Sequence, residues 1–202
     1  MVSKLLRRVL TVTLGCALAA FAVGGISGCA NADEQAIRAG ISRDLDAFKN
    51  PTQASLSSVI DNDNASIREM RDMGIDPYDF LAHCFRGFDY EIRDVKVSDK
   101  TATVTLHVKN KDFSKAIEYA NEQAQDSSNL ATIQEISATG DQNGVIKKYA
   151  EWLYAGIDST SEMVEKDLTL KLTKADDGTW NVDDESVKAL VEQMYGGVSV
   201  GQ

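Results

Sequence analysis

The 202-residue sequence has few of the side chains that bind metals or form disulfides, with two histidines, His83 and His107, and three cysteines. A transition-metal site needs three or four convergent His, Cys, Asp or Glu ligands. The sequence also contains no serine-centred nucleophile elbow, glycine-rich phosphate loop or zinc-protease motif. We therefore predict no metal, no cofactor and no catalytic residue set.

Basic side chains are also scarce, since 21 Lys and Arg residues stand against 31 Asp and Glu residues. Three of the basic residues lie among the first 28 positions, which contain no acidic residue. The remaining 174 residues have 18 basic and 31 acidic side chains, a net charge of −13. This balance argues against nucleic-acid binding, which needs cationic side chains to displace phosphate counterions.

Long apolar runs are absent except near the N-terminus, where an apolar stretch covers residues 9–23. It follows Lys4, Arg7 and Arg8 and precedes the small-residue segment 24–28. This order is typical of a secretory signal. An uncleaved membrane helix is the alternative, because the run approaches the roughly 20 residues that span a bilayer.

The residues Ile26-Ser27-Gly28-Cys29 resemble the lipobox of bacterial lipoproteins, in which an aliphatic and two small residues precede the lipidated cysteine. The resemblance implies cleavage between Gly28 and Cys29, a diacylglycerol on Cys29, and a lipid-anchored protein of the cell envelope that faces outside the cytoplasm. Two acyl chains suffice for stable anchoring to the lipid bilayer. Cys16 fits less well, because cleavage there leaves too short an apolar core.

Cleavage at this point leaves Cys84 as the one unmodified cysteine, so no intramolecular disulfide is expected. Its neighbours Leu81 and Phe85 favour a small buried hydrophobe over a reactive thiol. We expect a leader over residues 1–28, a lipidated N-terminus with a short linker over 29–32, one domain over 33–197 and a loose tail over 198–202. The length suits a single core.

Helical periodicity is clearest over residues 33–48, where Ile37, Ile41, Leu45 and Phe48 share one face. Further helices are expected over 51–59, 65–73, 77–85, 112–125, 144–157 and 184–194. Period-two patterns predict one hairpin over 88–108, with a bulge at Arg93-Asp94, and a second over 164–182 with a turn at 176–178. The polar segment 126–143 is expected to be a loop with at most a broken helix.

The expected fold class is α+β, with helices packed on a curved antiparallel sheet of about four strands. The strand of residues 101–113 passing into a helix, and the 168–182 hairpin with its Asp-Gly turn and tryptophan, resemble small bacterial lipoproteins with a domain similar to the nuclear transport factor two fold. That resemblance implies a cone-shaped sheet able to enclose a pocket against the helices.

Five aromatic residues are candidates to line this pocket: Tyr78, Tyr90, Trp152, Tyr154 and Trp180. Packing between sheet and helices explains the two tryptophans equally well. The sequence favours a non-catalytic ligand-binding or protein-interaction module whose partner is a small ligand or an envelope protein. Two alternatives stay open: an enzyme that uses carboxylates such as Asp89 and Glu91 in the cone, and a structural envelope protein.

Overall fold

The computed structural model describes residues 22–23, 30–60 and 62–198. Gly28 and Cys29, where cleavage and lipidation are predicted, lie outside the described residues, as do most of the leader and residues 199–202. The elements in chain order are β1 (Ala22–Val23), α2 (Ala30–Lys49), α3 (Gln53–Ser57), α4 (Ala65–Asp72), α5 (Pro77–Cys84), β2 (Asp89–Ser98), β3 (Thr101–Lys111), α6 (Phe113–Gln125), α7 (Ser127–Ala138), α8 (Gln142–Ser159), β4 (Met163–Lys174), β5 (Trp180–Val182) and α9 (Asp184–Met194).

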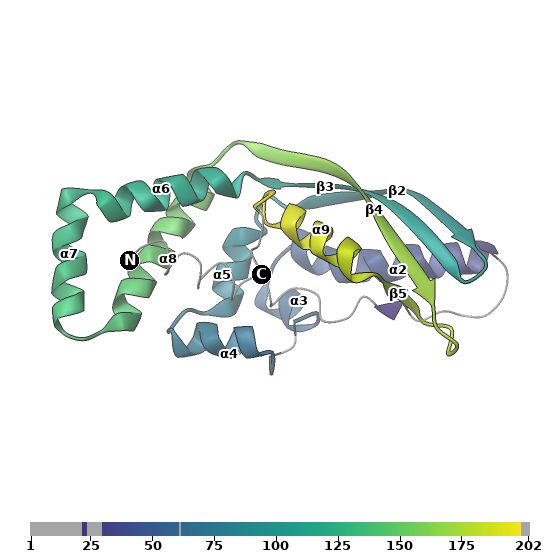
Figure 1. Ribbon diagram of the computed structural model, residues 1–202, viewed down its shortest axis with the longest axis horizontal. Helices are drawn as coiled ribbons and strands as arrows, with labels where there is room; N and C mark the ends of the chain where they lie inside the picture. The colour runs from purple at the N-terminus through teal and green to yellow at the C-terminus, as the bar shows by residue number, and fades with distance from the viewer. Residues whose placement is uncertain (1–21, 24–29, 61, 199–202) are drawn as a thin grey trace.

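The strands form one open antiparallel sheet in the order β1-β5-β4-β3-β2 (Figure 1). Strands β2 to β5 are the four that the sequence predicts, and β1 adds two residues at one edge. The α+β class and the antiparallel sheet are therefore confirmed. The register shifts between Ile92 and Asp94, where the sequence predicts a bulge.

Helix α2 lies along β2 and runs in the opposite direction (Figure 1). In its first half, Arg38 Nη1 donates a hydrogen bond to the carbonyl of Ile92 at 3.3 Å. At its end, Lys49 Nζ pairs with Asp89 Oδ1 at 2.6 Å. The first turn of α2 therefore lies at the same end of the molecule as the turn between β2 and β3.

The core lies between the sheet and the helices, and one face of the sheet is left to solvent. On β3 the side chains of Val104, Leu106 and Val108 are fully buried, while Thr101 and Thr103 on the other face are exposed. The buried apolar core extends from Ile37 to Tyr195. A chain of residues 29–202 thus retains the whole described core.

Helices α6, α7 and α8 form a lobe at the end of the long axis opposite the β2–β3 turn (Figure 1). Helices α6 and α8 approach so closely that a Cβ added at Gly156 would lie 2.7 Å from the carbonyl oxygen of Ala116. Within the described ranges, no helix is long and apolar enough to cross a bilayer.

The prediction of a loop over residues 126–143 is wrong, because residues 127–138 form α7. Asp126 caps this helix by accepting a hydrogen bond from the backbone N–H of Ser128. No residue of α7 is buried. Local capping and the neighbouring helices therefore define it, rather than a strong apolar stripe.

Candidate functional site

The first turn of α2 follows the predicted lipidation site directly in the sequence and makes contacts with the β4–β5 hairpin. Asp33 Oδ1 accepts hydrogen bonds from Lys174 Nζ at 2.6 Å and from Trp180 Nε1 at 3.3 Å. The Lys174 ammonium also lies 5.4 Å from the centre of the Trp180 ring. We call Asp33, Lys174 and Trp180 the anchor junction.

The sheet register brings the two partners of Asp33 together, since Lys174 at the end of β4 pairs directly with Trp180 at the start of β5. An aspartate in the first turn of a helix is also favoured by the helix dipole. The hydrogen bond from Lys174 is the main reason why the pKa of Asp33 is lowered, and Trp180 adds to it while burial opposes it. Asp33 is therefore held as an anion even though it is buried, with only 8% of its surface exposed.

The anchor junction fixes the start of α2 to the β4–β5 hairpin. Helix α2 begins at Ala30, so residues 30–32 of the predicted linker are helical. The residue directly after Cys29 thus already belongs to a helix whose Ile37 and Ile41 side chains are completely buried.

Three of the five aromatic residues predicted to line a pocket make contacts in separate parts of the core. Tyr90 on β2 donates a hydrogen bond to Asp46 Oδ1 of α2 at 2.7 Å. Trp152 is buried on α8, with the Lys148 ammonium 5.8 Å from its ring centre. Trp180 is completely buried in the anchor junction.

The other two aromatic residues lie around α5. The Tyr78 hydroxyl donates to Asn62 Oδ1 at 2.6 Å, and the Tyr154 ring lies 5.7 Å from that of Phe80. Among the hydrogen bonds and ring contacts of the described residues, none joins two of the five predicted side chains. All five take part in packing or in local hydrogen bonds, and a shared pocket stays a prediction.

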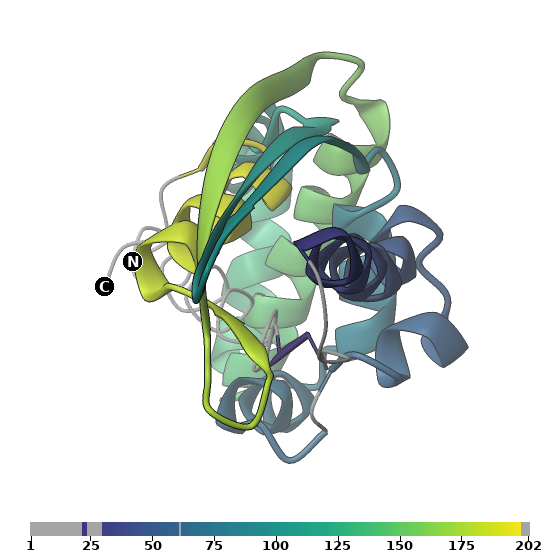
Figure 2. The same cartoon turned by 90° about the vertical axis from the view of Figure 1, so that its right-hand side faces the viewer.

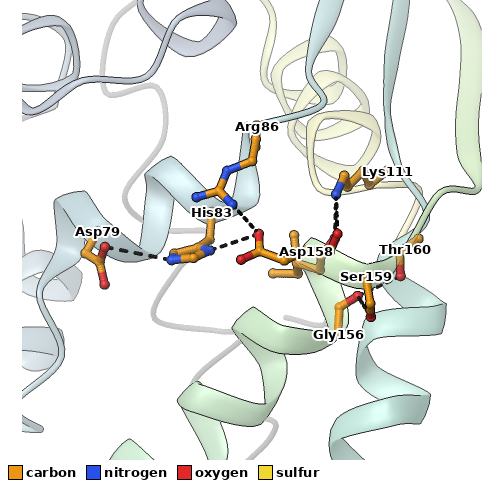
Figure 3. A network of polar contacts seen from close by, with 9 residues as sticks. Asp79, His83, Arg86, Lys111, Gly156, Asp158, Ser159 and Thr160 are labelled. Atoms are coloured by element: carbon orange, nitrogen blue, oxygen red, sulfur yellow. Dashed lines mark hydrogen bonds and ion pairs between the residues drawn. The ribbon is translucent and has the colours of Figure 1, made fainter.

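A polar network that the sequence does not predict joins α5 to the end of α8 (Figure 3). His83 Nδ1 lies 3.1 Å from Asp158 Oδ1, and Arg86 Nη1 donates to the same oxygen at 2.7 Å. On the other side of the imidazole, Nε2 lies 3.8 Å from Asp79 Oδ1. The helical spacing of Asp79 and His83 is visible in the sequence, but Asp158 is 75 residues from His83 and its approach depends on the fold.

The surroundings of His83 make this network a clamp between the two helices. The imidazole stacks on the Tyr154 ring at 4.5 Å, and its side chain is 17% exposed. Lys111 Nζ donates to the carbonyls of Ile157 and Asp158 at 2.7 and 3.2 Å, placing a positive charge where α8 ends.

The hydroxyls near this clamp are bonded to the backbone. Ser159 Oγ and Thr160 Oγ1 both donate to the carbonyl of Gly156, at 3.1 and 2.8 Å (Figure 3). A nucleophilic hydroxyl needs a hydrogen bond to its general base. These two instead point to the end of their own helix.

A second charged cluster lies on the solvent face of the sheet, where the register places Glu91, His107 and Asp167 side by side on β2, β3 and β4. His107 Nδ1 lies 2.7 Å from Asp167 Oδ1, and Arg93 pairs with the same carboxylate. The cluster is open to solvent, because the Asp167 side chain is 52% exposed.

Five aspartates of the described residues have a displaced pKa. In each of them the pKa is lowered: Asp33, Asp89, Asp126, Asp177 and Asp183. For Asp89, a candidate acid of the predicted cone, the main cause is the hydrogen bond from Lys49. A general acid at neutral pH needs the opposite displacement.

Two further observations concern the buried polar groups of the described ranges. Asp44 Oδ2 is the one buried side-chain nitrogen or oxygen there without a hydrogen bond, while its Oδ1 accepts from Arg43 Nε at 2.8 Å.

Burial raises the pKa of the Cys84 thiol, and this residue is a completely buried core side chain, as predicted.

The described ranges contain no cluster of three or more His, Cys, Asp or Glu residues suited to a metal ion. Comparisons with protein-family models, with curated proteins and with solved structures found no match.

Proposed function

We propose that this chain is a membrane-anchored extracytoplasmic lipoprotein that acts as a non-catalytic binding or interaction module, held to the bilayer through an acylated Cys29. The start of α2 at Ala30 is the observation that supports this best, together with the anchor junction three residues later. A lipid on Cys29 is then attached almost directly to the folded core.

This attachment gives the domain a defined orientation. Lys174 links Asp33 to the β4–β5 hairpin, and its backbone N–H donates to the carbonyl of Lys100 in the β2–β3 turn at 2.8 Å. Both turns therefore lie at the anchored end. The lobe of α6, α7 and α8 lies at the other end of the long axis (Figure 1) and faces away from the membrane.

We also propose that the domain belongs to the nuclear transport factor two-like type of fold. Its support is the long helix α2 on an antiparallel sheet, the passage of β3 into α6 across Asp112, and the β4–β5 hairpin. The twist of the sheet over α2 is visible in Figure 2. Helices α4, α5 and α8 are additions to that arrangement.

The anchor is tested by mass spectrometry of the N-terminus of protein extracted from bacterial membranes. We expect a chain that begins at residue 29 and carries a diacylglyceryl group. Cys29→Ala should prevent both cleavage and lipidation, whereas Cys16→Ala, the matched control, should change neither. An unmodified chain that begins elsewhere, or a lipid lost with Cys16, would refute the proposal.

The orientation is tested with fluorescent labels and lipid headgroups that carry a quencher. One label is placed at Asp176→Cys in the β4–β5 turn, where the native side chain is 97% exposed, and the other at the exposed Ser137→Cys of α7. We expect stronger quenching at position 176. Equal or reversed quenching would contradict the orientation.

A further inference from the structure

The edges of the sheet are protected in different ways. Unpaired strand edges bind other chains unless bulges, charges or covering elements prevent it. Strand β2 has its bulge after Ile92 and the charged, exposed residues Arg93 and Lys96. Natural edge strands use these features to avoid pairing.

Strand β4 extends well beyond the short strand β5, and α9 covers the part that β5 leaves open. Ser186 Oγ accepts a hydrogen bond from the N–H of Lys171 at 3.0 Å. Gln193 Nε2 donates to the carbonyl of Val164 at 3.2 Å. Helix α9 is thus hydrogen-bonded to β4 at two points.

The edge of β5 is covered by a segment of the predicted leader. Strand β1 pairs with it in antiparallel register, with Ala22 opposite Asn181 and Val23 opposite Trp180. Figure 1 shows β1 beside β5 and below α2. Because residues 22–23 precede Cys29, cleavage at the lipobox removes this strand.

The hydrogen-bond pattern shows which groups this removal leaves unpaired. Toward β4, Asp183 N–H donates to the carbonyl of Lys171, and Ala175 N–H donates to that of Thr179. Successive residues of a strand direct their backbone groups to opposite edges. Trp180, which lies opposite Val23, therefore directs its backbone N–H and carbonyl toward β1, and cleavage leaves them without this partner.

We propose that cleavage before Cys29 opens the edge of β5, and that the mature protein binds there an extended segment of small and β-branched residues from an envelope partner, in the antiparallel register of β1. This inference rests on the proposed cleavage. The leader itself supplies the argument for the occupant, because its Ala22-Val23 segment occupies the edge in this mode. Strand addition of this kind takes its affinity from main-chain hydrogen bonds.

A second copy of the chain fits this edge less well. Strand β5 has three residues, so two β5 edges pairing with each other would form a very short ribbon. Such a pair would share few main-chain hydrogen bonds, which supply the affinity of strand addition. A separate extended segment can also reach past the strand along α2.

The test uses the chain of residues 29–202 with Cys29→Ser, which keeps the whole described core. The probe is a peptide of residues 20–26 with lysines added at its ends. Two modified peptides are compared by isothermal titration calorimetry. N-methylation at Val23 removes a donor that faces Trp180, whereas N-methylation at Ala22 alters a group that faces away from β5. We expect the first to weaken binding about tenfold, the scale of one lost backbone hydrogen bond, and the second to have little effect.

Absence of binding by the unmodified peptide would overturn the proposal, and so would an equal loss with both modified peptides. A stable dimer of residues 29–202 without peptide would also overturn it, because a second copy would then occupy the edge. None of these outcomes depends on lipidation, which the N-terminal mass tests separately.

Discussion

Replacing Lys174 by methionine should destabilise the domain by about 2–3 kcal/mol, because hydrogen bonds to charged groups contribute about 1.5–3 kcal/mol and the variant leaves a buried anion at Asp33 without its partner. The side chains of Lys174 and Asp33 are 18% and 11% exposed, so solvent screens their pair only weakly. Asp33→Asn keeps an acceptor for Trp180 and should cost less, about 1–2 kcal/mol.

The double variant Asp33→Asn/Lys174→Met should be more stable than the sum of the single losses predicts, by at least about 1 kcal/mol, because the two side chains interact directly. The measurement is urea unfolding of residues 29–202 at pH 7, followed by circular dichroism. As a matched control, Lys100→Met removes the exposed pair with Asp176 and should cost less than about 0.5 kcal/mol.

The same pair predicts the sign of a pH effect. Because the folded pKa of Asp33 is lowered, its contribution is present above the unfolded carboxyl pKa of about 3.9 and is lost as the pH falls through the folded value. The difference between the wild-type chain and Lys174→Met should therefore shrink as the pH falls below about 4. Additive single effects at pH 7, or a difference that does not depend on acid, would refute the reasoning.

Three further predictions concern the core. Asn110→Leu should cost about 2–4 kcal/mol in urea unfolding, because the fully buried Nδ2 donates to backbone carbonyls of two other segments and the variant leaves them unpaired; a loss below 1 kcal/mol would contradict this. Gly156→Ala should cost about 1–3 kcal/mol and lower Tm, since its Cβ would clash with the Ala116 carbonyl; an unchanged Tm would show that the helices separate freely. Burial raises the pKa of Tyr90 to about 12, so Tyr90→Phe should remove a group that ionises near pH 12 in an ultraviolet titration. The stability that this raised pKa contributes is complete below about pH 10, the unfolded value, and is lost as the pH rises toward 12. Loss of a group that titrates near pH 10 would contradict this prediction.

The sequence predicts the elements of the sheet and its neighbours well because their patterns are strong. Alternation along residues 101–108 identifies β3, and the break at Arg93 correctly indicates the bulge. Asp76 and Asp183 cap α5 and α9, and both helices begin where the sequence predicts them. These signals are local, so one sequence suffices to find them.

The contacts between distant elements follow no local pattern. Asp33 and Lys174 are 141 residues apart, and nothing in the sequence pairs them. The same holds for His83 and Asp158. Helix α7 escaped prediction for another reason, since it buries no side chain and so lacks the apolar stripe that indicates a helix.

The start of α2 one residue after Cys29 has a mechanical consequence. A helix of 20 residues is about 30 Å long, so a tilt of about 10° at its first residue displaces its last residue by about 5 Å. Strand β2 is fastened along this helix by Arg38 and Lys49 and would move with it. With the proposed lipid on Cys29, undulations of the bilayer surface would turn the domain together with this helix and sweep its far lobe sideways, whereas a long flexible tether would absorb the motion.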